Sequence, residues 1–215
     1  MASSSELPTW YYRISDVIKK RNGVILWDFD EDITDFDETN PDETRKETIR
    51  KRKEDAREEE ENKIEQVRAA YEALQISMSK SESTPLGPID SQFDLYRMDY
   101  FDCFYDPSLR GYQSRYIRFE YEDTGEAHSD SLNGRFWLNP KIDFELLPFK
   151  APESSSLEYH EIYDTGGKFP LKQQFIDKGH LILRASRHLV FWGAPQDPRG
   201  PETFICVGAR NDWGK

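Results

Sequence analysis

The feature that most constrains this chain is a highly charged stretch, Asn40 to Ser79, that contains no helix-breaking residue after its start. Asn40 is a favourable N-cap, and Pro41 suits the first helical position, where a backbone N–H would have no partner. No glycine or further proline occurs until Pro85. A helix of this length would extend about 57 Å at about 1.5 Å per residue, which exceeds the diameter of a small domain. Part of it must therefore project or lie along a partner.

The two halves of this helix differ in chemistry, which predicts different surroundings for them. Between Asn40 and Lys63 the only aliphatic residue larger than alanine is Ile49. Opposite charges recur there at a spacing of four, as in Arg57 and Glu61, and each such pair stabilises an exposed helix by about 0.2–0.5 kcal/mol. An apolar stripe that requires burial follows at Ile64, Val67, Ala70, Tyr71, Leu74 and Met78. We expect a charged arm whose C-terminal half docks on the domain that follows.

A short coiled coil with a second copy of the chain is an alternative use of this helix. Its seam would contain Ile49, Ala56, Lys63, Ala70 and Ser77. Lys63 and Ser77 are unsuited to the apolar seam of a coiled coil, so a homodimer formed in this way is not favoured.

Composition divides the rest of the chain into three further parts. Residues 1–39 combine a leader, a short helix from Trp10, an apolar strand at 24–27 and an acidic loop. Residues 80–92 are rich in Ser, Pro and Gly and form a linker after the long helix at 40–79. Residues 93–215 are dense in aromatic residues and in turn signals, which predicts a β-rich domain.

About eight short strands in this last part predict an antiparallel, strongly curved sheet or a small β-barrel, and hence an α+β fold. Arg115 to Tyr121 shows the alternation of a half-buried strand, and residues 168–178 are expected to contain one short helix. The expected strands are Phe93 to Phe104, Tyr116 to Tyr121, Arg135 to Leu138, Phe144 to Leu147, Tyr159 to Tyr163, His180 to Ala185, His188 to Trp192 and Thr203 to Val207.

Charge and composition exclude several classes of function. The chain has 41 acidic and 29 basic residues, for a net charge of -12, which argues against nucleic-acid binding and against anionic membranes. No apolar run approaches the roughly 18 residues of a membrane span, and the N-terminus has no secretion signal. Cys103 and Cys206 are too few for a disulfide scaffold and are expected to be core thiols. These observations predict a cytoplasmic or nuclear protein.

Seven carboxylates crowd the eleven positions after the strand at 24–27, a density typical of a solvated loop. Asp28 and Asp30 resemble the Asp-x-Asp motif of the haloacid-dehalogenase-like phosphatases, which implies that Asp28 attacks phosphorus and Asp30 acts as acid and base. That family usually has Gly and then Thr or Val at the next positions, where this chain has Glu31 and Asp32. The chain also lacks the alternating helices and strands of a doubly wound sheet. The solvated loop is therefore the favoured interpretation.

A calcium loop is a second interpretation of the same segment, with oxygen ligands at Asp28, Asp30 and Asp32. An EF-hand needs Gly at its sixth position and Glu at its twelfth, where this chain has Ile33 and Thr39. The sequence therefore excludes an EF-hand.

One set of residues has the composition of an iron site. His128, Asp130 and His188 are the residue types of a two-histidine, one-carboxylate iron centre. With Arg199 eleven residues beyond His188, the set resembles the 2-oxoglutarate-dependent oxygenases, which implies that Arg199 holds the cosubstrate carboxylate. His-x-Asp arises often by chance, and residues 129–134 are typical of a turn, so a surface His128 and a strand-end His188 are favoured over metal binding.

The sequence contains no phosphate-binding glycine loop, zinc-ligand spacing or nucleophile elbow, and it indicates no cofactor. No family resemblance extends over a substantial length. The favoured interpretation is a non-enzymatic protein-interaction or scaffold protein that contacts protein partners through the charged arm and a face of the β domain. The alternative is a small-molecule-binding β-barrel, including an enzyme with the His128, Asp130 and His188 metal site. A filled barrel core would favour the first, and a deep pocket lined by aromatic residues would favour the second.

Overall fold

The computed structural model describes residues 41–105, 115–121, 131–139, 141–192 and 200–211. The short helix expected from Trp10, the strand at 24–27 and the acidic loop up to residue 39 lie outside the described residues. The chain separates into two compact units, residues 1–53 with 107–111 and residues 54–106 with 112–215. The second unit contains the sheet and the part of the long helix that packs on it.

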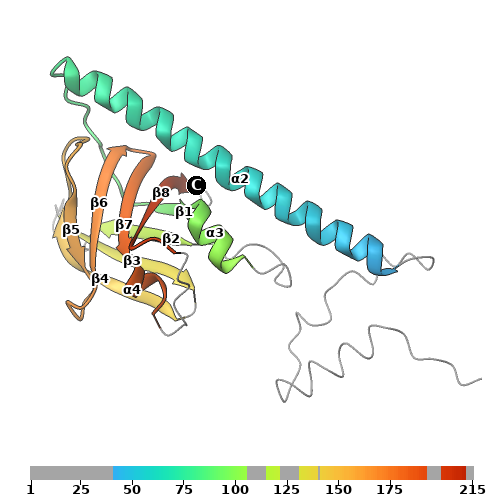
Figure 1. Cartoon of the computed structure of the whole chain (residues 1–215). Helices are drawn as coiled ribbons and strands as arrows, with labels where there is room; N and C mark the ends of the chain where they lie inside the picture. The colour runs from blue at the N-terminus through green and yellow to red at the C-terminus, as the bar shows by residue number, and fades with distance from the viewer. Residues whose placement is uncertain (1–40, 106–114, 122–130, 140, 193–199, 212–215) are drawn as a thin grey trace, which may run out of the picture. The chain divides into compact units, whose positions relative to one another are not determined.

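The second unit is built on one sheet of eight antiparallel strands in the order β4-β3-β2-β1-β8-β7-β6-β5 (Figure 1). Strands that follow each other in sequence are neighbours except β4 and β5, which form the two edges of the sheet. The first and last strands, β1 and β8, also pair, with Phe93 opposite Arg210. The strands are β1 (Gln92–Tyr96), β2 (Tyr116–Tyr121), β3 (Ser131–Asn139), β4 (Ile142–Lys150), β5 (His160–Tyr163), β6 (Pro170–Asp177), β7 (His180–Ser186) and β8 (Thr203–Asn211).

The two edge strands of the sheet approach each other, so the sheet is nearly barrel-shaped. Leu146 of β4 forms an isolated bridge with Asp164 just after β5, and the N–H of Thr165 donates to the carbonyl oxygen of Glu145 at 3.0 Å. This arrangement confirms the predicted α+β fold with a curved antiparallel sheet.

Side chains from opposite walls fill the interior of the sheet. In β2, Ile117 and Phe119 point inward while Arg118 and Glu120 are exposed, as the alternation predicts. The ring of Phe119 lies 5.4 Å from that of Phe175 on β6, on the opposite wall, in a tilted pair. Contact between rings from opposite walls leaves no open lumen at this level.

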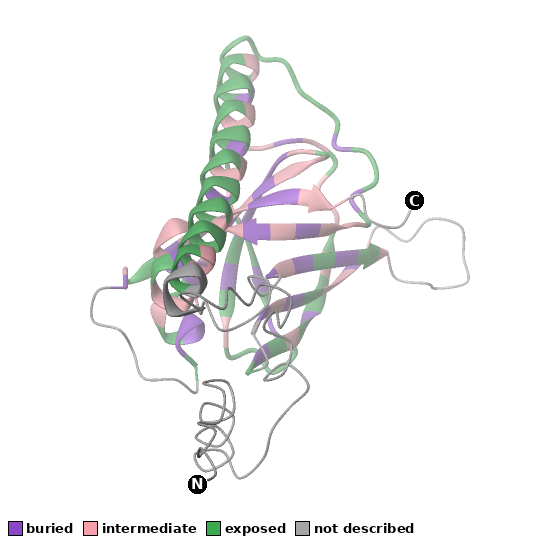
Figure 2. Ribbon diagram, turned by 90° about the vertical axis from the view of Figure 1, so that its right-hand side faces the viewer, coloured by how far each residue is buried: buried purple, intermediate pink, exposed green. Residues whose placement is uncertain are grey.

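The predicted long helix is confirmed as α2 (Pro41–Ser79), and its C-terminal part packs on the outer face of the sheet (Figure 2). Val67 and Leu74 are buried against Ile176 of β6, and Ala70 and Tyr71 pack beside them. These contacts bury one face of the C-terminal part of α2, as expected for an amphipathic helix. None of the described helices is long and apolar enough to cross a membrane.

The docked part of α2 differs from the expected stripe at both ends. Met78 was expected to be buried, but 39% of its surface is exposed, and so is 57% of Ile76. At the other end Glu60, inside the half expected to need no core, is 2% exposed. The buried residues Glu60, Val67 and Leu74 are spaced by seven, which is two helical turns on one face.

Three of the predicted elements are wrong. The strand expected over 93–104 ends at Tyr96, and the chain then forms α3 (Met98–Phe104). The strand expected at 188–192 is instead the short helix α4 (Arg187–Val190), whose N-cap Ser186 accepts a hydrogen bond from the N–H of Leu189. The helix expected within 168–178 is strand β6, which is buried on both faces because the barrel interior lies on one side and α2 on the other.

Candidate functional site

The metal site that the sequence offered as an alternative has one described member. His188 lies in α4 with an exposed side chain, and its ring is 5.2 Å from the ring of Trp192. His128, Asp130 and Arg199 lie outside the described residues. Among the residues that are described, no three His, Cys, Asp or Glu side chains are grouped so that they could hold a metal ion. The iron site therefore stays a prediction.

The contact between α2 and the barrel contains a buried ion pair. Nη2 of Arg115 lies 2.7 Å and 3.0 Å from the two carboxylate oxygens of Glu60, and the two residues are 4% and 2% exposed. The backbone N–H of Arg97 also donates to Glu60, and the guanidinium of Arg115 lies over the ring of Tyr100 at 4.9 Å. The buried carboxylate of Glu60 thus accepts hydrogen bonds from both Arg97 and Arg115, which compensate in part for the cost of burying its charge.

The surroundings of this ion pair shift the pKa of two neighbouring groups. Burial raises the pKa of the Cys206 thiol to about 11, although the charge of Arg115 opposes the shift. Burial, followed by the charges of nearby carboxylates, raises the pKa of Tyr96 to about 12. Both groups are consequently neutral at physiological pH, and Cys206 is not a reactive thiolate.

The β6–β7 turn makes a second polar contact with α2, at Gln66, six residues after Glu60. Nδ1 of His180 lies 2.9 Å from Oδ1 of Asp177, and the N–H of Gly179 donates to the same oxygen at 2.7 Å. Burial raises the pKa of Asp177, but these hydrogen bonds outweigh it and hold the pKa below its usual value. On the other side of the ring, Nε2 of His180 lies 3.2 Å from Nε2 of Gln66 on α2.

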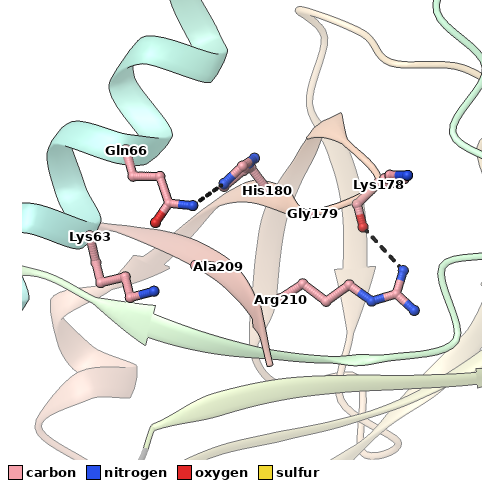
Figure 3. Close-up of a pocket in the computed structure, with 7 residues that line it drawn as sticks. All are labelled: Lys63, Gln66, Lys178, Gly179, His180, Ala209 and Arg210. Carbon is pink, nitrogen blue, oxygen red and sulfur yellow. Dashed lines mark hydrogen bonds between the residues drawn. The ribbon is translucent and has the colours of Figure 1, made fainter. Parts of the chain in front are cut away.

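A pocket of about 370 Å³ opens beside this contact (Figure 3). Three elements form it: α2, the β6–β7 turn and the end of β8. Its lining residues are Lys63, Gln66, Lys178, Gly179, His180, Ala209 and Arg210. The lining is basic in a chain whose net charge is -12.

The helix residues before Glu60 form a different kind of surface. We call residues 46–59 of α2 the exposed arm, because eleven of its fourteen side chains are exposed and none is buried. Arg57 pairs with Glu61 four residues on at 3.2 Å, as predicted, and also with Asp102 of α3 at 3.1 Å. Ion pairs of this kind stabilise a helix without a core.

Sequence analysis predicted the apolar residues at the contact between helix and barrel but missed the polar ones. Glu60 could have been found by continuing the apolar stripe of Val67 and Leu74 backwards by seven residues, although its charge conceals it. The pocket residues come from three separate segments and share no sequence pattern.

Comparison of this chain with protein-family models, with curated proteins and with solved structures found no match.

Proposed function

We propose that this protein is a non-enzymatic protein-interaction or scaffold protein, which contacts protein partners through the exposed arm of α2 and a face of the barrel. The observation that carries the proposal is the change in surroundings along one helix. Its C-terminal part is fixed to the barrel by Glu60, Val67 and Leu74, while residues 46–59 contain no buried side chain. A segment that is already helical before it meets a partner loses little conformational entropy on binding.

The composition of the exposed arm favours a protein partner. Its charges are of both signs, in blocks such as Arg50 to Lys53 followed by Glu54 and Asp55. A surface that carries both positive and negative charges binds specifically, and associates faster, with a partner whose charges are arranged in the complementary pattern. A uniformly charged polymer such as a nucleic acid has no such pattern. The surrounding acidic chain disfavours nucleic acid.

The barrel interior supports a structural role for the sheet. The rings of Phe93, Phe119 and Phe175 contact one another in its centre, at centroid distances of 5.4–6.2 Å. Interior side chains that pack to contact provide a rigid base for α2 rather than a ligand cavity at that level.

The test compares two charge-reversal variants of the full-length chain. In the arm variant Lys51, Arg52 and Lys53 become glutamate, and in the control variant three exposed barrel residues, Lys141, Lys150 and Lys172, become glutamate. Full-length variants are preferred to a deletion through residue 63, because that deletion would also remove the buried carboxylate of Glu60. Equal helicity by circular dichroism shows that both variants fold.

Partners captured by the wild-type protein are identified, purified and titrated against each variant. The proposal predicts that the arm variant weakens binding by about tenfold or more, because several charge contacts are reversed, and that the control variant, which leaves the arm intact, weakens it less. A partner that binds the arm variant as tightly as wild type would show that the arm is not the interaction surface.

A further inference from the structure

We propose that three aromatic side chains from the β5–β6 turn and the α4 region form a binding site for a quaternary ammonium group. We call Phe169, His188 and Trp192 the aromatic corner, because their rings contact one another at wide angles. The ring of Trp192 lies 5.1 Å from that of Phe169 and 5.2 Å from that of His188, at interplanar angles of 71° and 80°. This inference is independent of the exposed arm, because it uses no residue of α2.

The aromatic corner already holds a cation that belongs to the chain itself. Nζ of Lys168 lies 3.6 Å from the centroid of the Trp192 ring and 5.2 Å from that of the Phe169 ring. Both distances are within the roughly 6 Å over which the face of a ring attracts a cation. Among the described residues, none forms an ion pair or a hydrogen bond with the ammonium of Lys168. Its position therefore marks where an ammonium group fits.

The β5–β6 turn fixes the backbone beside the corner. The buried carboxylate of Asp164 accepts hydrogen bonds from the backbone N–H groups of Lys168 and Phe169 at 2.7 Å and 2.6 Å. The ring of Phe169 also stacks on that of Phe144 of β4 at 6.1 Å. The side chain of Lys168, in contrast, is exposed, and a cation–π contact at an exposed site is weak. A ligand can therefore displace the lysine without moving the rings.

Exposure and charge at the corner favour a cationic ligand. Trp192 is 37% exposed although Lys168 lies over its ring, so part of the ring surface is open to a ligand. In the described part of the chain, no Lys, Arg or His side chain forms an ion pair with the carboxylate of Asp164, which lies beside the backbone of Phe169. This carboxylate and the net charge of -12 give the region a negative potential that attracts cations.

The chemistry of the corner defines the ligand class. A lysine ammonium carries three N–H donors and is strongly hydrated, and a site made of ring faces offers these donors no acceptor oxygen. A quaternary ammonium has no N–H group that needs an acceptor, and its methyl groups contact ring faces directly. The expected ligand therefore contains a trimethylammonium group, either in a free choline-like molecule or on a trimethylated lysine side chain.

The test is a titration of the full-length ¹⁵N-labelled protein followed by NMR at the indole N–H of Trp192 and the amides of Lys168 and Phe169. The ammonium probes are choline and N-acetyl-trimethyllysine amide, each against sodium chloride at the same ionic strength. The neutral probe is 3,3-dimethylbutanol, which has the shape of choline without its charge. We expect saturable shifts from one or both ammonium probes, with a dissociation constant of about 10 mM or below, and much weaker binding of the neutral alcohol. The ammonium probe that binds more tightly identifies the source.

Two variants and a matched control decide whether the corner binds the probe. Lys168→Gln removes the competing cation and should strengthen binding about two- to fivefold, which is the effect of one exposed cation–π contact and cannot result from misfolding. Trp192→Leu should weaken binding by at least about fivefold. Trp137→Leu removes a tryptophan that stacks on Tyr116 and has no cation over its ring among the described residues, so it should leave the affinity unchanged.

Three results would each overturn the proposal. The first is the absence of saturable shifts from both ammonium probes in the wild-type protein and in Lys168→Gln. The second is equally tight binding of choline and the neutral alcohol, because the charge would then have no role. The third is equal affinity of the Trp192→Leu and Trp137→Leu variants, which would place the bound probe away from the aromatic corner.

Discussion

Removal of the buried carboxylate of Glu60 tests how α2 is held on the barrel. In Glu60→Gln the side chain keeps its size, but the charge of Arg115, 4% exposed, loses its counter-ion at 2.7 Å and 3.0 Å. Loss of one partner from a buried pair typically costs about 3–5 kcal/mol, because the remaining charge stays buried without compensation. The matched control is Arg57→Gln, which breaks exposed pairs with Glu61 and Asp102 and should cost about 1 kcal/mol or less in all.

Urea unfolding followed by tryptophan fluorescence measures both variants. With a slope of about 2 kcal/mol per molar urea, Glu60→Gln should lower the midpoint by about 2 M, and Arg57→Gln by less than about 0.5 M. The double variant Glu60→Met, Arg115→Met should recover most of the loss, since it leaves no buried charge. Equal midpoints for Glu60→Gln and Arg57→Gln would refute the burial of this ion pair.

Three further predictions follow from other buried groups. Burial raises the pKa of Cys206 to about 11, so a thiol reagent at pH 8 should label Cys103 in the folded protein and Cys206 only after unfolding. Peptide mass spectrometry would measure the two labelling rates, and equal rates would contradict the burial of Cys206. The lowered pKa of Asp177 means that its ionised form stabilises the fold above its usual pKa of 3.8 and that this contribution is lost as pH falls. Asp177→Asn should therefore lower the unfolding free energy at pH 7 and have little effect near about pH 2, and a pH-independent difference would count against this. Neither amide atom of Gln173 has a hydrogen-bond partner among the described residues, so Gln173→Leu should raise the unfolding free energy by about 1–3 kcal/mol. Gln174→Leu, which removes a hydrogen bond to a backbone carbonyl, should lower it, and the same sign for both changes would refute this explanation.

The parts of the fold that the sequence predicts are those in which local pattern and tertiary surroundings agree. The strand at 116–121 alternates apolar and polar residues because one face is interior and the other is solvent, and the structure confirms it. The long helix is likewise predicted, since its cap, its charge pairs and its apolar stripe all favour the same state.

The secondary structure was predicted wrongly where packing against another element, or an ambiguous local pattern, decides between helix and strand. In β6, Leu171 and Phe175 are four residues apart, which fits a helix, and only the packing of α2 on Ile176 makes a strand buried on both faces the stable structure. In α3 the sequence does contain a helical signal. Tyr100 and Phe104 are four residues apart and their rings stack at 4.4 Å, but the run of aromatics is equally typical of a strand.

The candidate sites were less accessible from the sequence than the fold. The exposed arm could be predicted from charge pairing alone. The sequence places its end at Ile64, but in the structure it ends at Glu60, because Arg115, just before β2, neutralises the buried carboxylate. The basic pocket depends on the register that places Arg210 and His180 beside Lys63 and Gln66, which is a property of the assembled sheet and helix.

The division of α2 at Glu60 is the central claim, and native-state hydrogen exchange of the full-length protein tests it most directly. Amides of residues 64–74, which pack on the barrel, should exchange through near-global unfolding, and amides of residues 46–59 through local fraying. A difference of about 3 kcal/mol in opening free energy corresponds to roughly a hundredfold slower exchange in the docked segment. Uniformly slow exchange along the whole helix would contradict the account, because it would mean that residues 46–59 are also packed against another part of the chain or a second copy.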